Sequence, residues 1–144
     1  MEIINTPIKE LVEIVPRIFT DSRGYFLEEF HREEFLEHGL PTEFLQTNRS
    51  FSYRGVLRGL HFQKIPHEQG KLVSVVSGRV LDIAVDLRKT SETFGKWYSV
   101  ILSGENRKML YLPEGFAHGF LAVEDSNFTY KCTHEYTPQA ESGI

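Results

Sequence analysis

Residues 54–78, RGVLRGLHFQKIPHEQGKLVSVVSG, predict β-strands that carry an unusual set of polar groups. Val56 and Phe62 are apolar, whereas Arg58 and His61 interrupt the same run. A strand with one solvent-exposed face normally presents polar residues without a chemical role on that face. An arginine and a histidine beside turn glycines indicate instead a concave polar face that handles an anion and a proton.

Further strands are predicted by short apolar or β-branched runs bounded by turn residues. Such runs cover residues 11–20, 24–30, 44–51, 71–76, 79–87, 95–102, 108–112, 119–123 and 128–134. The clearest pair is 71–76 and 79–87, and Ser77-Gly78 between them predicts a hairpin. In the second run, alternation assigns Leu81 and Ile83 to one face and Asp82 to the other.

One short helix is expected at residues 32–38, where Gly39 and Pro41 stop it. Short strands with turn signals and one minor helix indicate an all-β fold, an antiparallel jelly-roll sandwich or barrel. A chain of 144 residues is the size of one domain, so residues 1–144 are expected to form a single unit. Residues 137–144 suggest no closing element.

Composition narrows the expected location and partners. The net charge of -4 argues against nucleic acid as the main partner. The single Cys132 cannot pair within the chain, and residues 1–5 lack the features of a signal peptide. No apolar run reaches the length of a membrane span, so we expect a cytoplasmic protein without a membrane partner. An anionic ligand would need local cations, for which Arg23, Arg58 and Lys71 are candidates.

His61 is the first candidate for chemistry. A lone histidine in a strand is most often structural, but Gly59 permits close approach of a ligand and Arg58 supplies a forked cation. Histidine is also the side chain suited to carry a proton near neutral pH. His118 follows a second turn rich in proline and glycine, and Lys71 would stabilise an enolate if it faces the pocket.

Two further interpretations stay open at this level. Tyr130 or Tyr136 would serve as a general acid opposite the histidine, although strand tyrosines usually pack. A metal-dependent jelly roll is suggested by the spacing of His61, Glu68 and His118. Glutamine, here Gln63, occupies the second histidine position of that pattern and is a poor ligand for metals that prefer imidazole.

Six segments, in order along almost the whole chain, carry a resemblance to a known family. They are residues 21–26 (DSRGYF), 55–62 (GVLRGLHF), 69–73 (QGKLV), 85–88 (VDLR), 112–120 (LPEGFAHGF) and 130–133 (YKCT) with Tyr136. Together they resemble the dTDP-4-dehydrorhamnose 3,5-epimerase family. The resemblance implies a homodimeric jelly roll of the cupin type that needs no cofactor and no metal. Its members invert C3 and C5 of a dTDP-4-keto-6-deoxyhexose in deoxysugar biosynthesis of the dTDP-rhamnose kind.

The resemblance also assigns roles to individual residues. His61 would be the base, Lys71 would steady the oxyanion, and Tyr130 would return the proton. Such chemistry needs a base, a cation and an acid, because a proton beside a ketone is removable only when the enolate is stabilised. Arg23 and Arg58 would hold the diphosphate. The residues expected to line the sugar and nucleotide pocket are Phe26, Glu28, Gln46, Asn48, His118 and Tyr136.

The chain departs from the family pattern at its C-terminus. Family members continue past the position of Ile144 into a Trp-Asp-Asp-Pro-like run, which includes the aspartate that hydrogen-bonds the catalytic histidine. From this we expect ligand binding with weak catalysis, and Asp82 is a possible replacement for that aspartate. The alternatives are an epimerase acting on one carbon, a non-catalytic sugar-nucleotide binder, and the metal-dependent enzyme described above.

Overall fold

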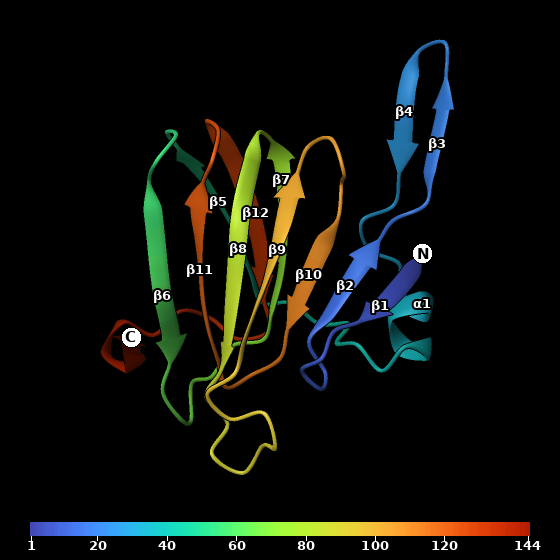
Figure 1. The fold of residues 1–144 in the computed structure, drawn as a ribbon. Coiled ribbons are helices and arrows are strands. Elements are labelled where there is room, and N and C mark those ends of the chain that lie inside the picture. Colours follow the sequence, from blue (N-terminus) through green and yellow to red (C-terminus); the bar gives the residue numbers. More distant parts are fainter.

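Two antiparallel sheets face each other in the computed structural model, which describes residues 1–144 (Figure 1). The six-stranded sheet has the order β1 (Glu2–Asn5), β2 (Val12–Val15), β10 (Met109–Leu112), β7 (Lys71–Ser77), β12 (Ser126–Cys132) and β5 (Gln46–Ser52). The five-stranded sheet has the order β13 (Glu141–Gly143), β6 (Leu57–Gln63), β11 (Phe116–Ala122), β8 (Arg79–Asp86) and β9 (Trp97–Ser103). The predicted all-β sandwich of antiparallel strands is confirmed.

The predicted helix is also confirmed, as α1 (Arg32–Glu37). The ring of His31 caps its first turn by accepting a hydrogen bond from the backbone N–H of Glu34. Its one buried residue, Phe35, joins an apolar cluster on the outer side of the six-stranded sheet. The cluster consists of Val12, Ile14, Phe35, Leu40, Leu72 and Met109. No helix of this protein has the length and apolar character that a membrane crossing requires.

The expected hairpin at Ser77-Gly78 is wrong. β7 pairs with β10 and β12 in one sheet, whereas β8 pairs with β9 and β11 in the other. Gly78 turns the corner with φ +88°, and a Cβ there would lie 2.2 Å from the carbonyl oxygen of Asp125. The glycine is therefore required by a sheet-to-sheet crossing rather than by a hairpin turn.

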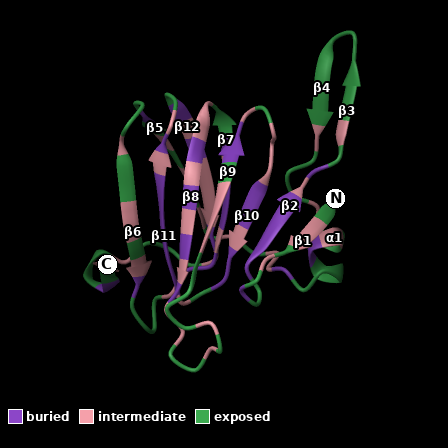
Figure 2. Cartoon of the chain, in the orientation of Figure 1, coloured by how far each residue is buried: buried purple, intermediate pink, exposed green.

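The alternation predicted for β8 is present, but its acidic residues are on the buried face and its larger apolar residues are on the outer face. The burial pattern alternates along the strand, and Asp82 and Asp86 belong to the buried set with Val80 and Ala84 (Figure 2). The apolar residues between them, such as Ile83, are only half-buried on the outer face. The aspartates point inward because the interior supplies each carboxylate with a partner.

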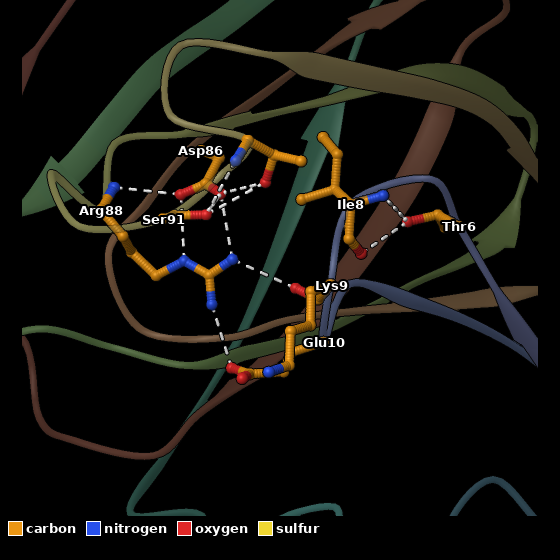
Figure 3. Close-up of polar contacts among 8 residues, drawn as sticks. Thr6, Ile8, Lys9, Glu10, Asp86, Arg88 and Ser91 are labelled. Carbon is orange, nitrogen blue, oxygen red and sulfur yellow. Dashed lines mark hydrogen bonds and ion pairs between the residues drawn. The ribbon is translucent and has the colours of Figure 1, made fainter.

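Asp86 illustrates how such a buried carboxylate is satisfied (Figure 3). It accepts hydrogen bonds from Nε and Nη2 of Arg88 and from the hydroxyls of Ser91 and Thr93. Burial alone would raise the pKa of Asp86, but these donors outweigh it and hold the pKa well below its ordinary range. Arg88 also binds the Glu10 carboxylate at 3.0 Å, so the network ties the loop after β8 to the N-terminal turn.

Apolar side chains from both sheets fill one end of the interior. Each large apolar side chain that is fully buried stabilises the fold by roughly 1.5–3 kcal/mol relative to exposure. The cluster contains Ile8, Leu11, Val73, Val75, Val80, Ala84, Leu102, Leu110, Leu112, Phe116, Phe120 and Phe128. The other end, near β5 and β6, is polar and open.

Two segments differ from the sequence-based expectation. The strand predicted over residues 11–20 is split at Pro16 into β2 and β3 (Ile18–Asp21), because proline has no N–H to continue a ladder. β3 pairs with β4 (Gly24–Leu27) in a separate hairpin that projects from the body at the upper right of Figure 1. Residues 137–144 do contain closing elements, namely a 3-10 turn (Pro138–Ala140) and β13, which pairs with β6.

Candidate active site

A cavity of about 670 Å³ opens between the sheets at their polar end. This volume falls within the roughly 300–1,000 Å³ typical of small-molecule sites. Its lining residues come from β5, β7 and β12 on one wall and from β6 and β11 on the other. The predicted site residues that line the cavity are Gln46, Asn48, Arg58, His61, Lys71, His118, Tyr130 and Tyr136.

Strand register brings one set of these residues together. Tyr130 of β12 lies opposite Asn48 of β5, and Cys132 lies between Gln46 and Lys71 on the flanking strands. Directly opposite residues in an antiparallel ladder point to the same face of the sheet. The inward face of the six-stranded wall therefore carries an amide pair, a phenol and an ammonium group.

The electrostatic state of Lys71 follows from its position in this wall. Burial lowers the pKa of the Lys71 ammonium below its ordinary value, against the opposing influence of Cys132, Asp82 and Glu141. Its Nζ lies 5.9 Å from the ring centroid of Tyr130. Burial likewise raises the pKa of the Tyr130 phenol, which stays protonated and can donate.

His61 lies on the opposite wall, where 54% of its side chain is exposed to the cavity and solvent. Its Nδ1 is 4.0 Å from Oε1 of Glu141, which reaches it from β13. The hydroxyl of Tyr136 donates a 2.6 Å hydrogen bond to the other oxygen of Glu141. His61 is thus accompanied by a carboxylate that a tyrosine holds in place.

Asp82 does not take the position suggested for it beside His61. Its Oδ2 lies 2.8 Å from Nε2 of His118, and both side chains are buried. Burial raises the pKa of Asp82, and the contact with His118 opposes that shift. His118 also stacks on Phe128 at 6.0 Å between ring centroids, so the pair fixes an imidazole in the cavity wall.

The glycine next to Arg58 lines the cavity and has a structural role as well. Gly59 has φ +105°, and a Cβ there would lie 2.7 Å from the Cα of Gly119 on β11. The missing side chain permits close approach of the neighbouring strand. Arg58 itself is held by hydrogen bonds from Nε to the hydroxyl of Ser52 at 2.8 Å and from Nη2 to the carbonyl of Phe51 at 3.1 Å.

The residues of the metal interpretation do not assemble. Glu68 is not part of the cavity lining. Gln63 uses its amide to clamp the backbone of Thr137, donating from Nε2 at 3.2 Å and accepting at Oε1 at 2.9 Å. No group of three histidine, cysteine, aspartate or glutamate side chains in the chain has an arrangement that would hold a metal ion.

Three predicted binding residues lie away from the cavity of their own chain. Phe26 is on β4, Arg23 is in the turn before it, and Glu28 directly follows it. None of them lines the cavity, and the hairpin projects at the side of the molecule opposite β6 (Figure 1). Phe26 is 63% exposed, and Arg23 is engaged only with Asp21, at 2.7 Å.

Some cavity residues were missed from the sequence. Glu141 gave no strand or motif signal, because its position depends on the backbone pairing of β13 with β6. Ser50, Gln63 and Gln69 also line the cavity. A signal for Ser50 exists in hindsight, since it alternates with Gln46 and Asn48 along one strand face.

An all-β sandwich that gathers an imidazole, an ammonium group and a phenol around one polar cavity has the layout of a cupin-type enzyme that moves protons. The family model described as dTDP-4-dehydrorhamnose 3,5-epimerase matches residues 5–144. The chain belongs to this epimerase family.

Relatives and solved structures agree with that assignment. The dTDP-4-dehydrorhamnose 3,5-epimerase of Methanothermobacter thermautotrophicus is 53% identical over 142 residues, which cover 98% of this chain and 76% of that relative. The crystal structure of the epimerase from Elizabethkingia anophelis matches with TM-score 0.96 and 49% identity, covering 100% of this chain and 80% of that one. The Legionella pneumophila dTDP-6-deoxy-D-glucose-3,5-epimerase, in complex with dTDP-4-keto-L-rhamnose, has TM-score 0.95 and 50% identity, covering 99% and 77%.

Proposed function

We propose that the protein epimerises a dTDP-4-keto-6-deoxyhexose at C3 and C5 through an enolate, as in the making of dTDP-rhamnose-type deoxysugars. The observation that carries the proposal is the convergence of His61, Lys71 and Tyr130 on one cavity. The related Legionella protein, which is bound to dTDP-4-keto-L-rhamnose in its crystal structure, supports the substrate class.

Each of the three side chains has one role in the reaction. His61 removes the proton from the carbon next to the C4 ketone, and the electron pair of the broken C–H bond moves into the enolate. The Lys71 ammonium donates to the enolate oxygen and offsets its negative charge. Tyr130 then delivers a proton to the same carbon, and its phenolate regains a proton from solvent.

Inversion requires that the proton leave from one face of the sugar ring and return on the other. His61 belongs to β6 in the five-stranded sheet, and Tyr130 belongs to β12 in the six-stranded sheet. A sugar ring between the two walls therefore has the base on one side and the acid on the other. This arrangement favours epimerisation over exchange with retention.

We propose further that the working protein is a homodimer whose subunits exchange the β3–β4 hairpin, called here the arm (residues 18–27). Arg23, Phe26 and Glu28 cannot reach the cavity of their own chain in this structure, because the arm projects away from it. An arm that crosses to a second copy would supply these residues to the neighbouring cavity. Arg23 would then join Arg58 at the diphosphate.

The outer face of the five-stranded sheet also supports a second copy as partner. β8 and β9 present apolar side chains there, with Val85 opposite Trp97 and Leu81 opposite Ile101. Trp97 is 65% exposed. An apolar sheet face of this kind is typical of a protein–protein interface. A cytoplasmic location is proposed as well, and the free thiol of the single Cys132 supports it.

The test is proton NMR of dTDP-4-keto-6-deoxyglucose in deuterated water with the purified protein. Epimerisation predicts loss of both the C3 and the C5 proton signals, together with new product signals. Loss of one signal alone would identify a single-carbon epimerase. Binding of the nucleotide sugar without any exchange would identify a non-catalytic binder and overturn the proposal.

A further inference from the structure

Arg107 touches the arm from the body of the protein. It lies in the turn between β9 and β10, and its guanidinium carbon is 3.8 Å from the centroid of the Tyr25 ring on β4. A guanidinium stacked on a tyrosine ring is attracted by the ring's quadrupole and by dispersion. The contact joins two parts of the chain that the sheets do not connect, since β3 and β4 pair only with each other.

The register of the arm shows which of its two faces Arg107 contacts. Successive residues of a strand point to opposite faces, so Tyr25 and Phe26 face opposite ways. Phe19 lies directly opposite Phe26, and their rings are 6.3 Å apart. The opposite face carries Phe19, whose ring centroid lies 4.9 Å from the guanidinium carbon of Arg17, and Phe26, which is 63% exposed.

Arg107 combines a strained backbone with a buried side-chain nitrogen that has no hydrogen-bond partner. Its backbone has φ 54°, a left-handed conformation that costs free energy for a residue with a side chain, and its N–H donates to the carbonyl of Ser103 at 2.9 Å. Its Nε is buried without a hydrogen-bond partner. No carboxylate forms an ion pair with its guanidinium, so the Tyr25 ring is the partner that orients this group.

We propose that Arg107 is a positioning residue that anchors the arm of its own subunit and thereby sets substrate affinity at the cavity of the neighbouring subunit. This inference rests on the proposed function and on the exchanged arm. Arg107 does not touch substrate; it acts through Tyr25 and the strand that carries Phe26. Loosening the anchor raises KM for the sugar nucleotide. It leaves kcat nearly unchanged, because His61, Lys71 and Tyr130 lie in the two large sheets and not in the arm.

The first experiment measures the anchor directly, without substrate. Amide hydrogen exchange over residues 18–27 is followed in the wild type and in Arg107→Ala and Tyr25→Leu variants. Exchange about tenfold faster in both variants is expected, since this ratio corresponds to a strong cation–π contact. Tyr25→Phe keeps a ring face and should match the wild type, as should Arg32→Ala, which removes an exposed arginine from α1. Unchanged exchange in Arg107→Ala would overturn the anchor.

The second experiment measures KM and kcat. Arg107→Ala is expected to raise KM about tenfold, and combining it with Tyr25→Leu should add little because both changes break one contact. Alanine and arginine are both disfavoured at a positive φ because both have a Cβ. The substitution therefore does not change the backbone strain of the turn. A wild-type KM in Arg107→Ala would overturn the inference, as would a loss confined to kcat.

Mixed dimers carrying two different tags test delivery to the neighbour. When one subunit carries His61→Asn and the other Arg107→Ala, the working cavity receives an anchored arm, and a wild-type KM is expected. When one subunit carries both substitutions and the other is wild type, the working cavity receives the loosened arm, and KM should rise. The reverse result would mean that the arm serves its own subunit, and a monomeric protein would equally overturn delivery between subunits.

Failure of the proposed function is distinguishable from failure of this inference. A wild-type protein that neither binds nor turns over the nucleotide sugar would remove the epimerase proposal. The hydrogen-exchange comparison would still decide whether Arg107 anchors the arm. Faster exchange in the variants would then support an anchor, and unchanged exchange would overturn it.

Discussion

His61 and Glu141 meet diagonally across neighbouring strands, with Nδ1 of the imidazole 4.0 Å from Oε1 of the carboxylate. This distance exceeds that of a hydrogen bond, so the contact acts through charge. The 2.6 Å hydrogen bond from Tyr136 fixes the carboxylate at its other oxygen. When His61 accepts the substrate proton, the new imidazolium lies beside a negative charge that is already held in place.

Glu141→Gln should therefore lower kcat. We expect a fall of about tenfold, because both side chains are partly exposed and solvent screens the pair. The measurement is the rate of C3 and C5 deuterium incorporation at saturating substrate. Glu135→Gln is the matched control, since it removes an exposed carboxylate of the same segment that does not line the cavity. Equal rates in the two variants would rule out a role for Glu141.

His61→Asn should abolish exchange while dTDP binding persists. The base acts on the chemical step, whereas nucleotide contacts come from other residues. Deuterium incorporation and calorimetric titration with dTDP separate the two effects. His67→Asn, an exposed histidine outside the cavity, should retain full exchange. A His61→Asn protein with wild-type exchange rates would eliminate this residue as the base.

Lys71→Met should abolish turnover and stabilise the fold. Burial lowers the pKa of Lys71, which means that the folded state holds the ammonium at a cost that methionine avoids. The free energy of unfolding should rise by about 1 kcal/mol at neutral pH, as is common when a functional group is removed from an active site. Lys64→Met, which replaces an exposed lysine, should leave the free energy of unfolding unchanged.

The stabilising effect of Lys71→Met should also depend on pH in a defined direction. Because the folded pKa is the lower one, the unfolded wild type binds more protons between that pKa and the ordinary lysine value of 10.5. Wild-type stability therefore rises with pH across this window, and the advantage of the variant shrinks. Thermal unfolding of both proteins from pH 7 to pH 10 checks this. A constant difference would contradict a lowered pKa.

Chelation should leave activity intact. Gln63 is occupied with the backbone of Thr137, and Lys71 supplies the positive charge that a metal would otherwise bring to the enolate. The check is turnover before and after dialysis against EDTA, with metal content measured by mass spectrometry. Stoichiometric metal together with activity lost on its removal would overturn the metal-free mechanism.

Some features were predictable from sequence because their signals are local. The helix at Arg32–Glu37 is followed by Gly39 and Pro41, and these stop signals act within one turn. The polar residues Arg58 and His61 stand out in an apolar strand, and the cavity does contain them. The alternation of apolar and acidic residues along residues 79–87 likewise predicted the two different faces of β8.

Other features depend on partners that no local pattern identifies. Ser77-Gly78 has the composition of a hairpin turn, but which sheet receives the next strand is decided by distant strands such as β12. Alternation does not say which face of β8 is buried, because the inward-facing Asp82 meets a partner, His118, on another strand. The position of Phe26 relative to the cavity depends on the path of the arm after Pro16.

The crossing at Gly78 has a consequence for the order in which the molecule assembles. β7 and β8 adjoin in sequence but share no ladder. β8 can pair with the next strand, β9, whereas β7 has no partner until β10 and β12 are available. Pairings between distant segments close late and slowly. The two walls that carry Lys71 and His61 therefore come into register only near the end of folding. Recovery of nucleotide binding should thus mark completion of the native state, and not an early collapsed form.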